Sequence, residues 1–260
     1  MSGVTLSGVR KVFPGHGPRD EAVIALDDVS FCINDREFCS ILGHSGCGKT
    51  TLLMLLAGFE RPTHGEILMD GALVGAPTWQ RTVVFQEYAL FPWLTVRQNI
   101  AFGLEMKQVP RADCQDIVAR HVYLVGLQGF EDRYPYQLSG GMKQRVSIAR
   151  ALAVDPSVLL MDEPFAALDA QNRARMQEEM GRLLASGDAN VCKTMVLVTH
   201  SIEEAILLSD HVVVLTRRPG HVKADLVIDL PRPRREVDPR FAEWKQHIRD
   251  LVHDEYEPER

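Results

Sequence analysis

Apolar and polar positions alternate through the amino-terminal part of the chain. The segments VTLSGVRKVF, from residue 4, and VIALDDVSFCI, from residue 23, follow this alternation, and a Gly/Pro-rich break at Pro14–Pro18 separates them. Alternation with period two is typical of strands that bury one face. We therefore predict antiparallel strands joined by a surface loop.

Short uninterrupted apolar runs follow. The run Phe38–Leu42 ends in a glycine and precedes a helical stretch, Lys49–Phe59. Three similar runs occur later in the chain: Val158–Met161, Met195–Thr199 and His211–Leu215. Such runs suit strands buried on both faces of a parallel sheet. A strand, a Gly-rich turn and a helix begin an α/β unit, so the sequence predicts an α/β fold.

The middle of the chain, about Thr95–Val154, has the apolar spacing of helices, most clearly in Ala112–Val125 and Gly141–Ala153. After Pro231 the composition changes to a charged, proline-containing linker, and Asp238-Pro239 marks a further helix start. One apolar stripe follows: Phe241, Trp244, Ile248 and Leu251. We interpret this tail as a docked helix. The alternative, a membrane anchor, is disfavoured by the short stripe and the mixed charges opposite it.

Composition narrows the classes of protein. The 260 residues are 45% hydrophobic and 25% charged, as in an ordinary globular protein of one large or two small domains. The formal charge of −6 argues against a general duplex-binding surface, so no nucleic acid partner is expected. No apolar run approaches the roughly 18–20 residues that cross a bilayer, and no secretion signal is recognisable, so we expect any membrane link to be through a partner. Five cysteines without a CxxC pair predict a reduced cytosolic chain without a metal site of their own.

A glycine-rich motif between a predicted strand and a predicted helix fits the pattern GxxxxGK[ST]. Its residues are Gly43, His44, Ser45, Gly46, Cys47, Gly48, Lys49 and Thr50. The glycines let backbone N–H groups turn toward phosphates, the helix start and Lys49 add positive charge, and the Thr50 hydroxyl can ligate Mg²⁺. The alternative is a Gly-rich turn with a surface lysine, which the match at every fixed position disfavours.

Two carboxylates, Asp162 and Glu163, end the apolar run that begins at Val158. Asp162 is suited to hold Mg²⁺ through water, and Glu163 to polarise an attacking water. The alternative is an ordinary strand end followed by an acidic turn.

A further motif, LSGGMKQR at Leu138–Arg145, offers a second anion site. Ser139 is suited to cap a helix, and Gly140 and Gly141 expose backbone N–H groups at its start. Ser139 lies 23 residues before Asp162. One nucleotide seldom needs two such helix starts from the same molecule.

Over roughly residues 4–230 these motifs, in this order, resemble the ABC transporter ATPase family, whose signature is LSGGxxQR. The resemblance implies a P-loop NTPase (RecA-like) core with an N-terminal antiparallel β-subdomain and an inserted α-helical subdomain at about 92–154. Together these make a nucleotide-binding domain over 1–230, followed by a charged tail over 231–260 with a short amphipathic helix. It also implies ATP and Mg²⁺ as ligands, and a homodimeric ATPase.

The resemblance assigns further residues. Gln86 is similar to the glutamine that joins metal and water to the helical subdomain, Asp169 to the loop that crosses to the opposite subunit, and His200 to the histidine that contacts the γ-phosphate. Phe13 resembles the aromatic residue that stacks on adenine, although the commoner residue is tyrosine and the 36-residue gap to Lys49 is long; the alternative is a core position. Thr51 joins the phosphate-binding residues. Cys47 is either a small residue that fits the loop or a reactive thiol.

Finer resemblance indicates the nitrate/sulfonate/taurine/bicarbonate importer branch. It rests on FQEYALFPWLTV (85–96), RPG (218–220) and DLPRPR (229–234). It implies a peripheral subunit on the cytoplasmic face of the bacterial inner membrane, with two transmembrane permease subunits and a periplasmic or extracellular solute-binding protein. Phe91 and Trp93 are expected to be exposed and to suit a partner's helix, with a core position as the alternative. Which small anion is carried stays open.

Two other functions stay open: an ATPase of an importer for another small organic solute, and a non-transport ABC ATPase. The second would need long coiled-coil insertions or zinc modules, and neither heptads nor CxxC pairs occur. An inactive ATPase is disfavoured because Lys49, Thr50, Glu163 and His200 are all present.

Overall fold

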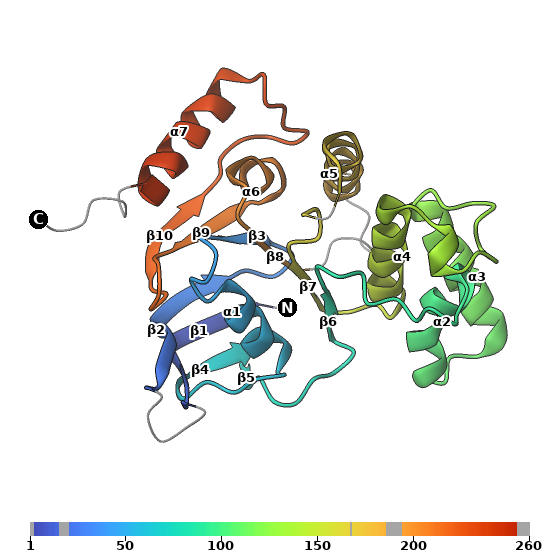
Figure 1. The fold of residues 1–260 in the computed structure, drawn as a ribbon, viewed down its shortest axis with the longest axis horizontal. Coiled ribbons are helices and arrows are strands. Elements are labelled where there is room, and N and C mark those ends of the chain that lie inside the picture. Colours follow the sequence, from blue (N-terminus) through green and yellow to red (C-terminus); the bar gives the residue numbers. More distant parts are fainter. Residues whose placement is uncertain (1–2, 16–20, 167, 186–193, 254–260) are drawn as a thin grey trace, which may run out of the picture.

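The computed structural model describes residues 3–15, 21–166, 168–185 and 194–253. In this part of the chain two sheets and the helices packed around them are arranged as Figure 1 shows. Three features named above include residues outside the described ranges: the break at Pro14–Pro18, the five cysteines, of which Cys192 lies outside, and the tail over 231–260.

The first sheet is antiparallel, with the order β2-β1-β4-β5. Its strands are β1 (Val4–Phe13), β2 (Val23–Ile33), β4 (His64–Met69) and β5 (Ala72–Leu73). Val4 and Leu6 of β1 are buried in the core, and so is Val9, which follows a register shift after Leu6. The alternation therefore predicted β1 and β2 correctly, whereas the sequence did not single out β4 and β5.

The second sheet has, among the described residues, the order β10-β9-β3-β8-β7-β6. Its strands are β3 (Phe38–Leu42), β6 (Arg81–Val84), β7 (Val158–Asp162), β8 (Thr194–Thr199), β9 (His211–Leu215) and β10 (Val222–Val227). Neighbouring strands are parallel except for β10, which is antiparallel to β9. Every residue of β3, β7, β8 and β9 is buried, which confirms the parallel sheet predicted from the apolar runs.

Three helices and one 3₁₀ turn lie together beyond β6 and β7 (Figure 1). They are α2 (Val96–Met106), α3 (Arg111–Leu124), η1 (Pro135–Gln137) and α4 (Gly140–Ala153). Their apolar residues, including Ile100, Val118 and Val146, share a core of their own. Helix α2 begins at a capping box in which Thr95 and Gln98 bond each other's backbone N–H. The helical middle of the chain is thus confirmed.

The remaining helices cover the sheets. They are α1 (Lys49–Ala57), α5 (Ala170–Ala185), α6 (Ile202–Leu208) and α7 (Pro239–His253). Helix α1 ends two residues before the predicted end at Phe59, because Gly58 adopts a left-handed conformation and its N–H bonds the last turn.

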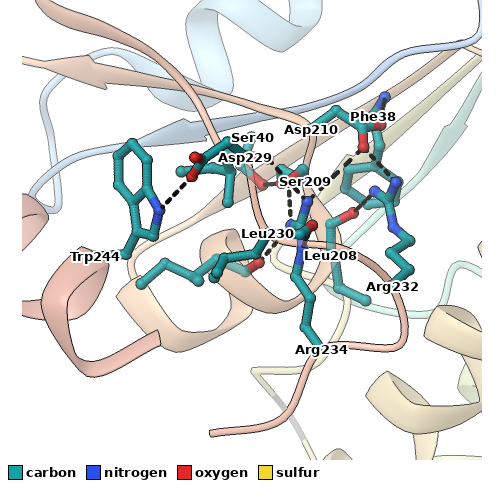
Figure 2. A network of polar contacts seen from close by, with 12 residues as sticks. Phe38, Ser40, Leu208, Ser209, Asp210, Asp229, Leu230, Arg232, Arg234 and Trp244 are labelled. Atoms are coloured by element: carbon teal, nitrogen blue, oxygen red, sulfur yellow. Dashed lines mark hydrogen bonds and ion pairs between the residues drawn. The ribbon is translucent and has the colours of Figure 1, made fainter. Parts of the chain in front are cut away.

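The carboxyl-terminal helix α7 packs beside α6 (Figure 1). Phe241 and Ile248 are buried in a cluster with Leu42, Ile206 and Val214. The linker before α7 is tied to α6 by the contacts in Figure 2, in which Arg234 donates to the carbonyls of Ile206, Ser209, Ile228 and Leu230. These contacts confirm the docked helix. Among the described helices, none has the length and apolarity to span a bilayer.

Candidate active site

The ends of the parallel strands bring the predicted site residues to one edge of the second sheet. In the sheet register Leu42 lies opposite Thr199, Asp162 opposite Val198, and Val84 opposite Met161. The segments that follow β3, β6, β7 and β8 therefore leave the sheet at the same edge. These segments carry the phosphate loop, Gln86, Glu163 and His200.

The phosphate loop is held tightly against β2. Gly48 caps α1 with φ 101°, and a Cβ atom there would lie 2.8 Å from the carbonyl oxygen of Ala25 and 2.7 Å from Leu26 Cδ2. Only glycine fits this conformation and this close approach. The first N–H groups of a helix have no partner within the helix, so a glycine-rich loop at a helix start is an arrangement that binds anions.

Lys49 begins α1 and folds back over its own loop. Its Nζ donates to the carbonyl oxygens of Gly43 at 2.8 Å and His44 at 2.9 Å, and the residue is 6% exposed. The loop therefore holds a full positive charge beside the partial charge of the helix start.

Thr50 and Asp162 meet across the strand edge. The Thr50 hydroxyl donates to Asp162 Oδ1 at 3.4 Å. Burial raises the pKa of Asp162, and Glu163 raises it further, while the Thr50 hydrogen bond and the charge of Lys49 act in the opposite direction. A hydroxyl and a carboxylate are the hard oxygen ligands that Mg²⁺ prefers, so these residues fit the expected ion.

Glu163 and His200 form the second pair at this edge. His200 Nδ1 lies 3.2 Å from Glu163 Oε2, and the His200 side chain is 63% exposed. Glu163 has φ 43°, and its backbone N–H donates to the Val198 carbonyl at 2.9 Å. A non-glycine residue in the left-handed region is uncommon, and here the bond to β8 holds it in place.

The structure also describes the other predicted residues. Gln86 follows β6 and is exposed. Asp169 is exposed and accepts hydrogen bonds from the backbone N–H and the side-chain amide of Asn172, which lower its pKa. Phe13 is half-buried, and Lys11 Nζ lies 4.9 Å from its ring centroid. Adenine stacking by Phe13 stays a prediction.

The signature motif lies away from the phosphate loop. Ser139 caps α4 by accepting from the Met142 N–H at 3.3 Å. A Cβ atom at Gly140 would lie 2.9 Å from the Tyr88 hydroxyl, a contact that a small movement of the tyrosine side chain would relieve. In Figure 1, α1 and α4 lie on opposite sides of β6 and β7. The two predicted anion sites therefore do not converge within one chain.

Two contacts to the phosphate loop were not predicted. Arg218 Nε donates to the Gly46 carbonyl at 3.3 Å, and His44 Nε2 lies 3.4 Å from the Val252 carbonyl oxygen in α7. The RPG segment was recognised in the sequence, but nothing in its pattern indicates which carbonyl it contacts. Cys47 is 1% exposed, which favours the small residue that fits the loop over the reactive thiol.

The expectation for the two aromatics is right for one of them. Trp93 is 69% exposed. Phe91 is only half-buried rather than exposed, because its ring packs on Phe102 at 4.4 Å between centroids and the Arg150 guanidinium lies over its face.

Comparison with known proteins identifies the family of this chain. A family model described as ABC transporter matches residues 26–166. An uncharacterized ABC transporter ATP-binding protein of Methanocaldococcus jannaschii is 48% identical, over 96% of this chain and 91% of that protein. The chain belongs to the ABC transporter family. A solved dimeric ATP-binding cassette in a post-hydrolysis state, bound to ADP and Pi, is 29% identical with a TM-score of 0.73, and the match covers 88% of this chain and 100% of that one. This member of the ABC transporter family is accordingly an ATPase with the ABC cassette fold.

Relatives with named substrates are also similar to this ABC ATPase. A taurine import ATP-binding protein of Roseobacter denitrificans is 41% identical, over 98% of this chain and 95% of that protein. Bicarbonate transport and nitrate import ATP-binding proteins of Synechococcus elongatus are 47% and 48% identical, over 90% and 88% of this chain. The chain spans 35% and 34% of the length of those two proteins.

Proposed function

We propose that this chain is the ATP-hydrolysing subunit of an importer for a small anion, of the nitrate, sulfonate, taurine or bicarbonate class. The observation that carries the proposal is the strand edge, where Lys49, Thr50, Asp162, Glu163 and His200 lie together. The named relatives support the substrate class by similarity alone.

In this proposal the chain's own groups divide the work. Lys49 and the backbone amides from Gly43 to Thr51 bind the phosphates of ATP, with Gly46 and Gly48 keeping side chains out of the way. Thr50, Asp162 and Gln86 hold Mg²⁺, which neutralises negative charge on the phosphate oxygens.

The groups for the hydrolytic step lie beside the phosphates. Glu163 takes the proton of the attacking water as the water adds to the γ-phosphorus and the bond to the ADP oxygen breaks. His200, 3.2 Å from Glu163, holds that carboxylate and contacts the γ-phosphate.

A groove next to Gln86 supports docking of a permease. The groove has a volume of about 720 Å³. Its lining is largely apolar and includes Phe59, Trp79, Phe85, Phe91, Phe102 and Met106. Trp79 and Met106 are 62% and 66% exposed, so the groove presents apolar side chains to a partner. We infer that a helical segment of a permease subunit lies here, which would place the ATPase at the cytoplasmic face of the bacterial inner membrane.

The ATPase roles are tested by two substitutions. Lys49→Ala is expected to weaken ATP binding, because it removes the full positive charge under the phosphates. Glu163→Gln is expected to bind ATP as before and to lose about 10²–10⁴-fold in turnover, since the amide has nearly the same shape but is not basic. Exposed Glu66→Gln on β4 is the control. Near wild-type turnover by Glu163→Gln would contradict the role given to Glu163.

The substrate class is tested by reconstitution with the cognate permease and a periplasmic or extracellular binding protein. ATPase activity should rise when the binding protein carries one of the small anions named above. Stimulation by a sugar, a metal or an amino acid alone would contradict the anion class and favour the importer for another solute. Activity indifferent to any permease would favour a non-transport ATPase.

A further inference from the structure

A buried carboxylate outside the strand-edge site links the two loops that carry Glu163 and His200. Glu204, on α6, is 6% exposed. Its Oε2 accepts a hydrogen bond of 2.6 Å from the Thr199 hydroxyl, and its Oε1 accepts one of 3.0 Å from the Gln177 amide on α5. Both carboxylate oxygens are therefore engaged by neighbouring elements.

The Thr199 hydroxyl carries this network to the loop of His200. It accepts from the backbone N–H of Ser201 at 3.0 Å, and Ser201 Oγ in turn accepts from the Glu204 N–H at 3.2 Å. Thr199 and Ser201, the residues on either side of His200, are thus both hydrogen-bonded to Glu204. The His200 imidazole itself stays exposed and extends toward Glu163.

Helix α5 connects the hydrogen-bond network of Glu204 to the loop after Glu163. Arg173 lies one turn before Gln177, so the two side chains share a face of α5. Arg173 Nε donates to the Phe165 carbonyl at 3.2 Å, and its Nη2 donates to the Leu168 carbonyl at 3.0 Å. Arg173 and Gln177 therefore join the loop after Glu163 to the buried carboxylate.

We propose that Glu204 is a positioning residue, which sets His200 against Glu163 through Thr199 and Gln177. The proposal rests on the roles given above to Glu163 and His200. A buried carboxylate is expensive to desolvate, and an apolar side chain of similar volume would suit a purely structural position at least as well. Glu204 instead supplies two acceptors on opposite sides, which an apolar residue cannot do.

Four variants of the full chain test this positioning. Glu204→Ala removes both acceptors, and Thr199→Val removes the hydroxyl at nearly constant shape. Each should lower kcat on the order of tenfold or more while changing the Kd for ATP little, because the loop shifts but the phosphate loop does not. Glu204→Gln should recover most of the activity, since the Gln177 amide can turn over and accept from the new amide. Glu243→Ala, at an exposed position of α7, is the control.

Two readouts separate positioning from general damage. In a His200→Ala background, Glu204→Ala should add little further loss, because the two residues act as a unit. The imidazole C–H resonance of His200, assigned by its absence in His200→Ala, should shift or broaden in Glu204→Ala and Thr199→Val but not in Glu243→Ala. If Glu204→Ala fails to fold, Thr199→Val gives the same two measurements.

The outcomes distinguish this inference from the proposed function. Unchanged kcat in Thr199→Val, full additivity with His200→Ala, or an undisturbed His200 resonance would overturn the positioning role. Full activity in His200→Ala alone would instead overturn the role proposed for His200, while the resonance would still report whether Glu204 places that side chain.

Discussion

At the scale of one residue, burial of the Asp162 carboxylate lowers the stability of the folded protein. Asp162 is 8% exposed, and burial raises its pKa. The folded state therefore binds a proton at this group more tightly than the unfolded state does. Its contribution to stability falls as the pH rises from the ordinary aspartate range through the raised pKa, and the whole penalty is present at neutral pH.

We therefore expect Asp162→Asn to stabilise the ligand-free protein at neutral pH, by on the order of 1 kcal/mol. The asparagine oxygen can still accept from Thr50. The gain should shrink as the pH falls toward the ordinary aspartate range, which urea unfolding at a series of pH values measures.

Exposed Asp116→Asn on α3 is the control for that series. In the same samples, Asp162→Asn should lose the stabilisation that MgATP gives the wild type, because a magnesium ligand is gone. A gain that grows on acidification would contradict the assignment.

Residues of the candidate site differ in how well the sequence predicts them. Lys49, Thr50 and Asp162 belong to local motifs whose spacing carries their chemistry, and the structure brings them together as expected. Glu204 and Arg218 could not be found in this way, because they meet their partners only through the fold. Glu204 is one of two adjacent acids on α6, and nothing local shows which of the two is buried.

At the scale of elements, the sequence predicted a helix or strand correctly where its apolar pattern is long or uninterrupted. The buried strands were found to within a residue or so, because burial on both faces makes them uniformly apolar. Helices α3 and α4 were found nearly as well, because packing on one face gives each of them a helical period. Helix α6 has seven residues, too few to show a period. Helix α5 is mostly polar, and Met176 and Met180 are buried among its described side chains. The edge strand β10 is only partly buried, so its apolar run is broken by polar residues.

The linker before α7 carries a prediction on stability. The Arg234 side chain is 2% exposed, and burial lowers its pKa to about 10, so it remains charged at neutral pH. Its guanidinium donates to four backbone carbonyls, two of them in or just after α6 (Figure 2). These carbonyls would otherwise be buried without partners, which costs about 1–3 kcal/mol for each group.

Arg234→Met should accordingly destabilise the protein by roughly 2–4 kcal/mol in urea unfolding. The loss is smaller than the sum over four carbonyls because some of them can bond water once the guanidinium is gone. The neighbouring Arg235→Met is the matched control, because Arg235 is exposed and should change stability by about 0.5 kcal/mol or less. Equal unfolding midpoints for the two variants would show that the arginine does not fasten the tail.

At the scale of the whole molecule, the separation of the two anion sites is the feature that remains to be explained. The phosphate loop precedes α1, the signature motif begins α4, and the second sheet lies between them (Figure 1). Within one chain the two motifs therefore lie apart. The similarity to a solved dimeric cassette supports a second copy of the chain.

We expect the working ATPase to be a head-to-tail dimer in which Ser139 and the Gly140 and Gly141 amides complete the site held by Lys49 of the other copy. Donors that arrive from the partner would stabilise charge on the γ-phosphate, and one such donor is typically worth on the order of 10²–10³ in rate.

Because Glu163→Gln should retain ATP, ATP should move this variant from monomer to dimer on a sizing column. Adding Ser139→Arg should abolish the dimer and leave ATP binding by the monomer intact, since Ser139 belongs to the opposite site. A double variant that still dimerises with ATP, or one whose monomer no longer binds ATP, would contradict the composite site.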